Sequence, residues 1–533
     1  MPHQINLINT AGLTLTFWDG GVLANRNNNV VDGGSGVWQS SASAIGNWTT
    51  LTGSTNAPWT DGAFAIFEGT AGTVSVDNSL GQVSASGLDF SVGGYVINGE
   101  PLTLTETNAG TGRTTIRVGD GSASGASSTA TIASLLQRST QLVKADLGTL
   151  ILNSANTYTG GTAITGGTLQ VASDANLGAA AGSVSFNGGT LATTATFSTA
   201  RATTLDAGGG TFDVANATTL TMSAAIGGEG ALNKRNTGVL VLTGANTYSG
   251  GTTIAAGTLA VGGGGTSGSL AGNVTNHGTL VFNRGDTVTY GGVISGTGPV
   301  SQAGAGTTVL TGTNIYTGGT TISAGTLQLG NGTTNGSIIG NVTNNAVLAF
   351  KPATGTTMTF GGVISGTGAI HQTGTGTTFL TGANTYSGGT AVNGGTLQVS
   401  NDANLGAAAG ALSFNGGTLV PIESFSTARA TTLNAGGGTF DVADATTLTL
   451  SGAIGGPGTL SMTNTGTLVL SGTSTYTVGC VVPVEFDDAL VASLRKGAIL
   501  NITATTDNGR EAAFKISLNG FGSALARTAD LSK

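Results

Sequence analysis

The side chains that could carry acid–base, nucleophilic or metal chemistry are few and widely scattered. The 533 residues include 3 His and 1 Cys. His3, His277 and His371 lie in unrelated contexts, and His277 aligns with Asn345 of a second, similar stretch, which predicts a surface or turn position rather than a metal ligand. Cys480 has no His close upstream, and none anywhere downstream, that could activate its thiolate. The sequence therefore predicts a free or intermolecularly paired thiol, without an internal disulfide or a cysteine zinc site.

Some charged residues occur twice, at equivalent positions of duplicated stretches of the sequence. Asp213 and Asp441 occupy equivalent places in GTFDVA, and Arg201 and Arg429 do so in FSTARATTL. Because each charge is duplicated with its surroundings, we expect a structural role, such as hydrogen bonding to backbone amides at a corner of the fold. The alternative is a carbohydrate-active enzyme, which needs carboxylates gathered in one groove, and the sequence shows no cluster such as D-x-D.

Motifs for phosphate, cofactor or calcium binding give no usable signal. Residues 263–268 match G-x-G-x-x-G, but with 93 Gly in the chain such matches arise by chance, and no helix is expected to follow. There is no G-K-S/T phosphate loop, no G-x-S-x-G elbow and no tandem series of calcium-binding nonapeptides. The N-x-S/T matches at Asn47, Asn216, Asn273 and Asn341 are expected to arise by chance. No catalytic, cofactor-binding or metal-binding residue is predicted.

The overall composition excludes several classes of protein. Only 8% of the residues are charged, and the net charge of −8 offers no basic face for nucleic acid. The mean hydropathy of +0.21 argues against disorder. The sequence contains no run of about 18 apolar residues, so no transmembrane helix is predicted. The first residues lack the basic and apolar regions of a signal peptide, so none is expected in the sequence as written.

The chain is built from internal repeats. One phrase, exemplified by GVLVLTGANTYSGGTTIAAGTLAV from Gly238, occurs four times in full and once as a half copy. Its Tyr residues are Tyr158, Tyr248, Tyr316, Tyr386 and Tyr476. Two kinds of module separate the copies: a long one from Asp174 that recurs from Asp402, and a short one from Asn273 that recurs from Asn341.

Within each copy the apolar residues alternate with Thr, Ser or Gly, which predicts short, half-buried strands separated by turns. Repetition over hundreds of residues with so little charge favours a coiled parallel solenoid, with about 22 residues per turn and some 20 turns in a rod on the order of 100 Å long. The ANTYSGG segment is expected to form a corner, where Asn and Gly supply caps and positive φ angles and the Tyr can stack along the rod.

All four Trp residues fall near the beginning of the chain. They are Trp18, Trp38, Trp48 and Trp59. A solenoid must cover its first turn, so we expect an aromatic-rich cap, with a sugar-stacking site as the alternative.

The repeated phrase resembles the autotransporter-associated β-strand repeat, also called the passenger-associated transport repeat. This resemblance implies a right-handed parallel β-helix from the passenger of a Gram-negative autotransporter, exported to the cell surface. Such passengers carry an N-terminal signal and a C-terminal translocator barrel. Neither is visible in the sequence, so we expect the passenger to be truncated before its barrel.

The phrase breaks after Thr477, and residues 478–533 differ in character. Charged side chains are much denser in this segment than in the repeats that precede it. Asp487 or Asp488 is expected to cap a short helix, and Asn508-Gly509 to turn a hairpin. This segment resembles the C-terminal part of the invasion associated locus B family, small exported bacterial proteins. We hypothesise that two unrelated coding segments meet near Val478.

We therefore predict an all-β fold: a right-handed parallel β-helix with a Trp-rich N-terminal cap and a small α+β C-terminal fragment. The predicted domains are 1–140, a β-helix region with the cap; 141–477, the repeat β-helix; and 478–533, the C-terminal fragment. The expected function is a non-enzymatic surface stalk or adhesin without cofactors. Its expected partners are host or cell-surface glycans or proteins, or other copies of itself, and not nucleic acid. A carbohydrate-active lyase or glycosidase, and a non-functional chimeric fragment, are the alternatives.

Overall fold

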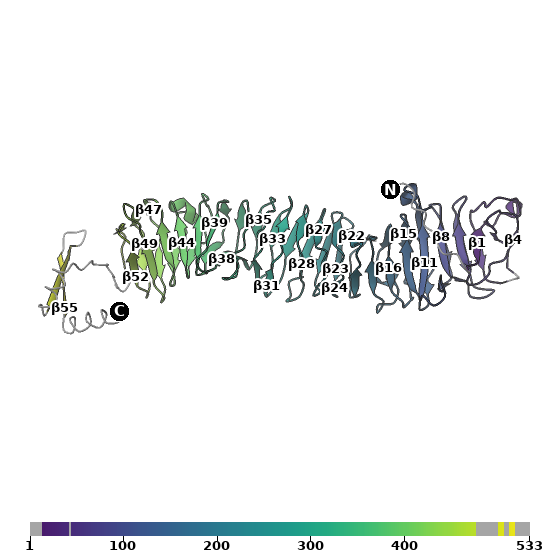
Figure 1. The fold of residues 1–533 in the computed structure, drawn as a ribbon, viewed down its shortest axis with the longest axis horizontal. Helices are drawn as coiled ribbons and strands as arrows, with labels where there is room; N and C mark the ends of the chain where they lie inside the picture. The colour runs from purple at the N-terminus through teal and green to yellow at the C-terminus, as the bar shows by residue number, and fades with distance from the viewer. Residues whose placement is uncertain (1–12, 42–43, 476–498, 506–510, 518–533) are drawn as a thin grey trace, which may run out of the picture.

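The computed structural model describes residues 13–41, 44–475, 499–505 and 511–517. Up to residue 475, the described chain forms a long rod (Figure 1) in which parallel strands stack as a β-solenoid of about 19 turns. At about 4.8 Å per turn the rod is roughly 90 Å long. Helix in the described residues is confined to four short 3-10 segments: η1 (Leu23–Asn25), η2 (Ser124–Ser127), η3 (Asp174–Leu177) and η4 (Asp402–Leu405). The predicted all-β solenoid is confirmed.

An antiparallel turn and a Trp cluster close the N-terminal end of the rod. Strand β1 pairs in parallel with β5 on one side and antiparallel with β3 on the other, and β3 pairs antiparallel with β4. The strands of this region are β1 (Leu15–Trp18), β2 (Gly36–Gln39), β3 (Trp48–Thr49), β4 (Asn56–Ala57), β5 (Phe64–Phe67), β6 (Thr73–Asp77), β7 (Ser84–Ala85), β8 (Gly87–Phe90), β9 (Val96–Gly99), β10 (Leu102–Leu104), β11 (Arg113–Val118), β12 (Thr129–Ile132) and β13 (Leu136–Gln137).

The Trp side chains form this cap by packing on one another. Trp48 lies 5.1 Å from Trp18, 5.0 Å from Trp38 and 4.4 Å from Trp59, measured between ring centroids. None of the four is more than 4% exposed. The predicted aromatic cap is confirmed, and the sugar-stacking alternative is wrong because the rings have no free face.

Together with the strand that precedes it, each full copy of the repeated phrase forms four strands and the half copy forms two, and we count that preceding strand as part of the copy from here on. They are β14 (Gln141–Ala145), β15 (Thr149–Leu152), β16 (Thr162–Ile164) and β17 (Thr168–Val171); β25 (Leu232–Arg235), β26 (Val239–Leu242), β27 (Thr252–Ile254) and β28 (Thr258–Val261); β33 (Val300–Gln302), β34 (Thr307–Leu310), β35 (Thr320–Ile322) and β36 (Thr326–Leu329); β41 (Ala369–Gln372), β42 (Thr377–Leu380), β43 (Thr390–Val392) and β44 (Thr396–Val399); β52 (Leu460–Thr463) and β53 (Thr467–Leu470).

The modules between these copies add further turns to the same stack. The long modules hold β18 (Val184–Phe186), β19 (Thr190–Thr193), β20 (Phe197–Thr199), β21 (Thr203–Leu205), β22 (Gly210–Val214), β23 (Thr219–Met222) and β24 (Ile226–Gly227), and their counterparts β45 (Leu412–Phe414), β46 (Thr418–Pro421), β47 (Phe425–Thr427), β48 (Thr431–Leu433), β49 (Gly438–Asp441), β50 (Thr447–Leu450) and β51 (Ile454–Gly455). The short modules hold β29 (Val274–Asn276), β30 (Thr279–Phe282), β31 (Thr287–Tyr290) and β32 (Ile294–Ser295), matched by β37 (Val342–Asn344), β38 (Val347–Phe350), β39 (Thr357–Phe360) and β40 (Ile364–Ser365).

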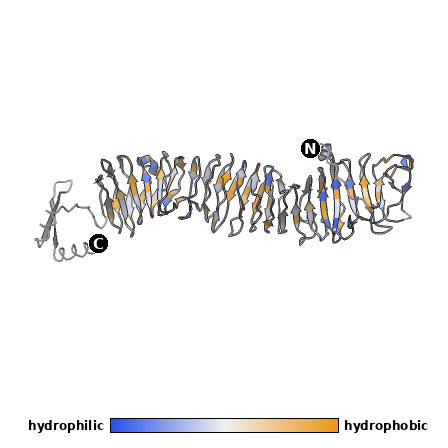
Figure 2. Ribbon diagram, in the orientation of Figure 1, coloured by the Kyte–Doolittle hydropathy of each residue, from blue (hydrophilic) through white to orange (hydrophobic). Residues whose placement is uncertain are grey.

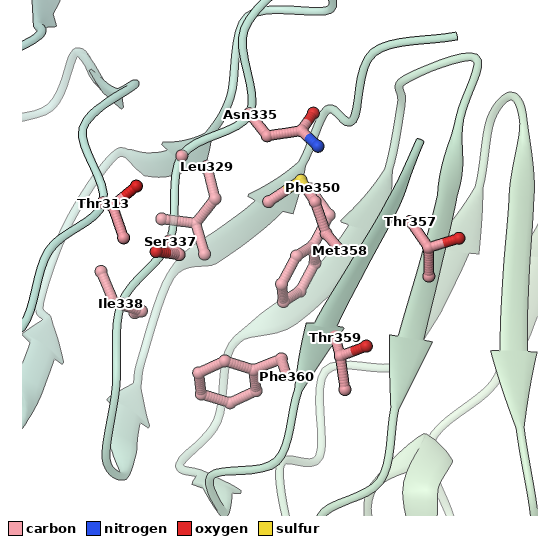
Figure 3. Close-up of a pocket in the computed structure, with 11 residues that line it drawn as sticks. Thr313, Leu329, Asn335, Ser337, Ile338, Phe350, Thr357, Met358, Thr359 and Phe360 are labelled. Carbon is pink, nitrogen blue, oxygen red and sulfur yellow. The ribbon is translucent and has the colours of Figure 1, made fainter. Parts of the chain in front are cut away.

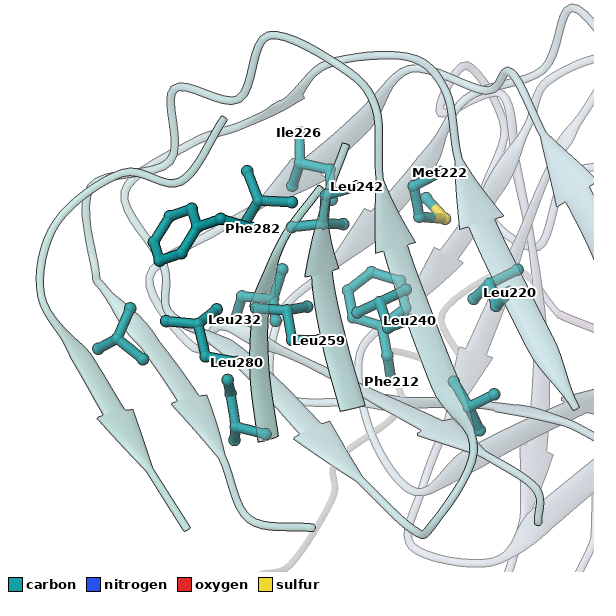
Figure 4. Packing of buried hydrophobic residues seen from close by; sticks show 14 of the residues in the cluster. Phe212, Leu220, Met222, Ile226, Leu232, Leu240, Leu242, Leu259, Leu280 and Phe282 are labelled. Atoms are coloured by element: carbon teal, nitrogen blue, oxygen red, sulfur yellow. The ribbon is translucent and has the colours of Figure 1, made fainter. Parts of the chain in front are cut away.

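The core is one continuous column of apolar side chains inside the coil. Leu150, Leu169 and Leu191 are successive register partners in β15, β17 and β19, and each is at most 1% exposed. Figure 4 shows Leu240, Leu259 and their neighbours packed in the same way between adjacent turns. Because side chains alternate along a strand, every second residue joins this column and the others point outward. Figure 2 shows strongly hydrophobic strand residues distributed along the length of the rod.

The corner formed by the phrase depends on glycine. The second Gly of T/S-G-G-T has a φ of +81° at Gly161, +78° at Gly251, +78° at Gly319 and +83° at Gly389. A residue with a β-carbon rarely adopts this conformation. The predicted role of these glycines is confirmed.

The Tyr of the phrase behaves differently from the prediction. Tyr158, Tyr248, Tyr316 and Tyr386 are fully buried, and each hydroxyl lies 2.6 to 2.8 Å from the Thr hydroxyl four residues later. No ring contact involves these four in the described part of the chain, because the phrase occurs once per several turns and its Tyr residues do not lie on adjacent turns. The Tyr therefore anchors a corner to the core, and its expected stacking along the rod is wrong.

The predicted C-terminal hairpin is confirmed in its strand pairing, while Asn508-Gly509 lie outside the described residues. Strands β54 (Ile499–Thr505) and β55 (Glu511–Ser517) pair antiparallel, with Ile499 opposite Ser517 and Thr505 opposite Glu511. The predictions for His3, Tyr476, Cys480 and a helix beginning at Asp487 or Asp488 lie outside the described residues.

Candidate functional site

The Asn of the repeated phrase ties three consecutive turns together. In copy two, Asn246 Oδ1 accepts a hydrogen bond from the Ile226 backbone N–H at 2.9 Å, and its Nδ2 donates to the Ser269 carbonyl at 2.8 Å. Asn156, Asn314 and Asn384 make the equivalent pair of bonds in the other copies. All four are buried, so this residue serves the geometry of the fold.

A second buried polar position caps the adjacent corner, and sequence reasoning missed it. Lys144 Nζ donates to the carbonyls of Ala145, Asp146 and Gly166 at 2.8, 2.8 and 3.1 Å. Lys234 does the same in copy two, and Gln302 and Gln372 fill this position in copies three and four. Both Lys side chains are fully buried. Burial lowers the pKa of Lys144 to about 7 and that of Lys234 to about 8.

The duplicated arginines are buried and hydrogen-bond to several backbone carbonyls. Arg201 is 2% exposed; its Nε bonds Asp174 Oδ1 at 2.8 Å, and its Nη atoms donate to the carbonyls of Ala179, Gly182, Asp174 and Gly178. Arg429 repeats these contacts around Asp402. The predicted structural role is confirmed for the arginines, although their backbone partners are carbonyls rather than amides.

Asp213 makes a contact of another kind, because its Oδ1 accepts from Asn236 Nδ2 on the next turn at 3.0 Å. Asp213 is half-buried in β22, and Asp441 is half-buried in the matching strand β49. No backbone amide bonds either carboxylate in the hydrogen bonds of the described residues.

Charged side chains gather on adjacent turns near the N-terminal end, which the sequence did not reveal. Ile66, Asp89, Arg117 and Ala145 are register partners in β5, β8, β11 and β14. Arg117 lies 3.5 Å from the Asp89 carboxylate and 2.9 Å from that of Asp146. Burial raises the pKa of Asp89 to about 6, although Arg117 opposes this, and burial also raises the pKa of Glu68. The sequence did not predict this cluster because its members lie about one turn of the coil apart along the chain.

A small pocket lies beside the second short module (Figure 3). Phe350, Met358 and Phe360 form its apolar wall, Asn335 and Ser337 lie opposite, and its volume is about 200 Å³. In the first short module, Arg284 bridges to the carbonyls of Thr266 and Gly268, whereas Pro352 occupies the aligned position in the second. The pocket is smaller than typical ligand sites, which measure about 300–1,000 Å³.

One outer face of the rod carries an unbroken column of polar side chains. Strands β12, β15, β17, β19, β22, β25, β27, β29 and β32 each contribute one residue to it in register. The residues are Thr129, Thr149, Thr168, Thr190, Thr211, Asn233, Thr253, Thr275 and Ser295. Thr275 is exposed and the other eight are half-buried. We call these nine residues the polar ladder, and successive members lie about 4.8 Å apart.

The remaining candidates lie apart from one another. His277 is exposed and its Nδ1 lies 3.1 Å from the Thr297 hydroxyl, which confirms its surface position, while His371 is half-buried in β41. Residues 263–266 form an exposed bend, Gly268 is buried, and the chain continues into β29, not into a helix. No group of three or more His, Cys, Asp or Glu in the described residues could hold a metal ion. No helix among them is long and apolar enough to cross a membrane.

Family models match two parts of the chain. The passenger-associated-transport-repeat model matches residues 142–171, 232–261, 300–329 and 370–399. Each of these matches covers the four strands of one full copy of the phrase. The invasion associated locus B (IalB) protein model matches residues 458–529, so this match begins upstream of the expected junction at Val478.

Two curated relatives agree with these matches. The chain is 44% identical over 279 residues to the adhesin BmaC autotransporter of Brucella suis biovar 1 (strain 1330), which is 51% of this chain and 8% of that protein. It is 48% identical over 56 residues to an invasion protein B homolog of Brucella abortus (strain 2308), which is 10% of this chain and 32% of that protein. The chain thus spans less than a tenth of the adhesin and about a third of the homolog. No solved structure matches. The chain carries four passenger-associated transport repeats, followed by a segment similar to the invasion associated locus B proteins.

Proposed function

We propose that this chain is a non-enzymatic, passenger-like adhesin displayed at a bacterial cell surface. The polar ladder carries the proposal: nine hydrogen-bonding side chains stand in register along one face of a rod. A single hydroxyl contact with a partner contributes little, but many contacts held at a fixed spacing act together once the first has formed. Similarity of half the chain to a protein named as an adhesin supports the same reading.

The partners that fit this face are polar, extended and repetitive. Thr and Asn side chains both donate and accept hydrogen bonds, as do the hydroxyls of glycans and the backbone of extended peptides. The low charge of the chain disfavours nucleic acid. We propose cell-surface glycans or proteins, or other copies of this chain, as the partners.

An attachment assay tests the proposal. Beads coated with the chain are added to cultured epithelial cells and to a printed glycan array. We expect attachment above that of uncoated beads, and at least a fivefold loss when Thr168, Thr190 and Thr211 are all changed to Lys. The matched control changes Thr377, Thr396 and Thr418, which are also consecutive register partners but lie in β42, β44 and β46. Equal attachment of both triple variants, or none by the parent chain, contradicts the proposal.

A carbohydrate-active enzyme is the second candidate function, because Asp89, Arg117 and Asp146 form a cluster of charged side chains. A carboxyl group with a pKa of about 6, beside an arginine on adjacent turns, has the properties of a general acid. Release of reducing ends from a panel of polysaccharides, lost on Asp89→Asn and kept on Asp213→Asn, supports this candidate. No release by the parent chain excludes it for that panel.

A further inference from the structure

In the part of the chain that the structure describes, the last turn of the rod lacks the cover that every earlier copy of the phrase has. In copies one to four, the first two strands are each followed in the stack by a strand from the second half of the same copy. In copy two, β25 pairs with β27 and β26 pairs with β28. In the half copy, β52 and β53 pair only with the preceding strands β49 and β50 among the described residues. The sequence gives the reason, because the phrase changes after Thr477 and its second half does not follow.

This open end leaves apolar side chains partly exposed to solvent. Leu240 and Leu242 in β26 are fully buried, whereas their counterparts in β53, Leu468 and Leu470, are only half-buried. Val469 between them is 37% exposed. At the opposite end of the rod, β3 pairs with β1, β4 pairs with β3, and the Trp side chains of the cap are buried.

The backbone of β53 also presents hydrogen-bonding groups at this end. The Thr467 and Ser471 N–H groups donate to the Thr446 and Leu450 carbonyls of the preceding turn, at 2.8 and 3.0 Å. Since backbone groups alternate in direction along a strand, the N–H groups of Leu468 and Leu470 face the open edge. Such an edge accepts an added strand, with backbone bonds giving affinity and side-chain pockets giving specificity.

We propose that this end face, formed by β52 and β53, binds an extended segment with the sequence of the phrase's second half, supplied by another polypeptide chain. The earlier copies define the occupant, because the same surface there is covered by T-x-I/V followed by G-T-L-x-V/L. In copy four, Thr377 pairs with Thr396, Thr378 with Leu397 and Leu380 with Val399. The incoming segment would therefore run parallel to β53, placing a Thr beside Thr467, a Leu beside Leu468 and a Val or Leu beside Leu470.

A peptide-binding experiment on the full chain tests this inference. The probe is a fluorescent peptide with the sequence of residues 386–399, YSGGTAVNGGTLQV, followed by fluorescence anisotropy. We expect saturable binding of one peptide per chain. Hydrogen exchange should locate it through increased protection of the Leu468 and Leu470 amides.

Two peptide variants provide a matched control that does not affect folding of the chain. Leu397 points inward and Gln398 outward in β44, so Leu397→Asp should weaken binding at least tenfold and Gln398→Asp less than twofold. Val469→Asp in the chain should also leave binding within twofold, because it faces outward. Absence of saturable binding, equal binding of both variant peptides, or protection appearing elsewhere overturns the inference.

Discussion

At the level of single residues, the corners of this fold depend on buried polar side chains that occupy equivalent positions in successive copies. The same cap is made by Lys144, Lys234, Gln302 and Gln372. A Gln side chain reaches the corner carbonyls without bringing a charge into the core, whereas a Lys must lose the hydration of its ammonium group. Two copies therefore carry a titratable group at a position where the other two have none.

This difference predicts a pH dependence of stability. The folded-state pKa values of about 7 and 8 lie below the ordinary value of 10.5, so the unfolded chain binds more protons between these limits. The cost of burying each ammonium is fully present below the folded pKa and disappears as the pH rises toward 10.5. We expect the parent chain to gain stability from pH 7 to pH 10 relative to the variant Lys144→Gln/Lys234→Gln, as measured by urea unfolding. Parallel stability profiles for the two proteins would contradict this prediction.

The two buried arginines, Arg201 and Arg429, can be compared with each other within one chain. Arg201→Met leaves the carbonyls of η3 and its neighbours without their donor and should cost about 3 kcal/mol locally. Because Arg429 makes the same contacts in the second long module, Arg429→Met should have the same effect on η4. Hydrogen exchange is expected to accelerate around residues 174–182 in the first variant and 402–410 in the second. Hydrogen exchange that accelerates evenly along the rod would show that these arginines do not act locally.

The sequence predicted some of these positions and not others. The substitution of Asn345 for His277 in a sister module correctly placed that side chain at the surface. The Lys and Gln cap escaped notice because the two residue types share only a long stem and a donor at its end. The cluster around Asp89 escaped notice because contact between turns depends on the number of residues in each turn, and short local motifs do not report it.

At the level of elements, alternation of apolar and polar residues was sufficient to predict the strands. The strand β26 reads Val-Leu-Val-Leu, and its two Leu side chains face the core while its two Val side chains are half-buried. The orientation of the corners was not predictable in the same way. The Tyr of the phrase belongs to the core because its hydroxyl finds a buried Thr partner, and alternation does not extend through a turn.

The N-terminal cap leads to a prediction about association. Trp48 packs on three other Trp rings, so Trp48→Ala should open a cavity costing roughly 3–5 kcal/mol and loosen the turn that covers β1. An uncovered first turn presents an open strand edge, which favours pairing between molecules. We expect concentration-dependent association in sedimentation velocity. Leu51→Ala, at a side chain that is 70% exposed, is the control and should remain unassociated. A Trp48→Ala variant that stays unassociated would argue against the capping role.

At the level of the whole molecule, the rod converts a loosely repeating sequence into a regular surface. Turns along the polar ladder differ in length, because the chain uses fewer residues between Thr149 and Thr168 than between Thr168 and Thr190. The corners absorb these differences, so the ladder residues remain in register. The sequence predicted a rod of about the right length, but the columns of side chains depend on the register, which only the structure shows.

The adhesive proposal requires this ladder to be straight and continuous, and a distance measurement tests that requirement most directly. Spin labels are placed on Thr129→Cys and Ser295→Cys in a chain carrying Cys480→Ser, and the separation is measured by pulsed electron spin resonance. Eight successive register steps join these two positions, so at about 4.8 Å per step we expect a narrow distribution centred at about 38 Å. A broad distribution, or a centre displaced by more than about two steps, would contradict the continuous ladder and with it the proposed binding face.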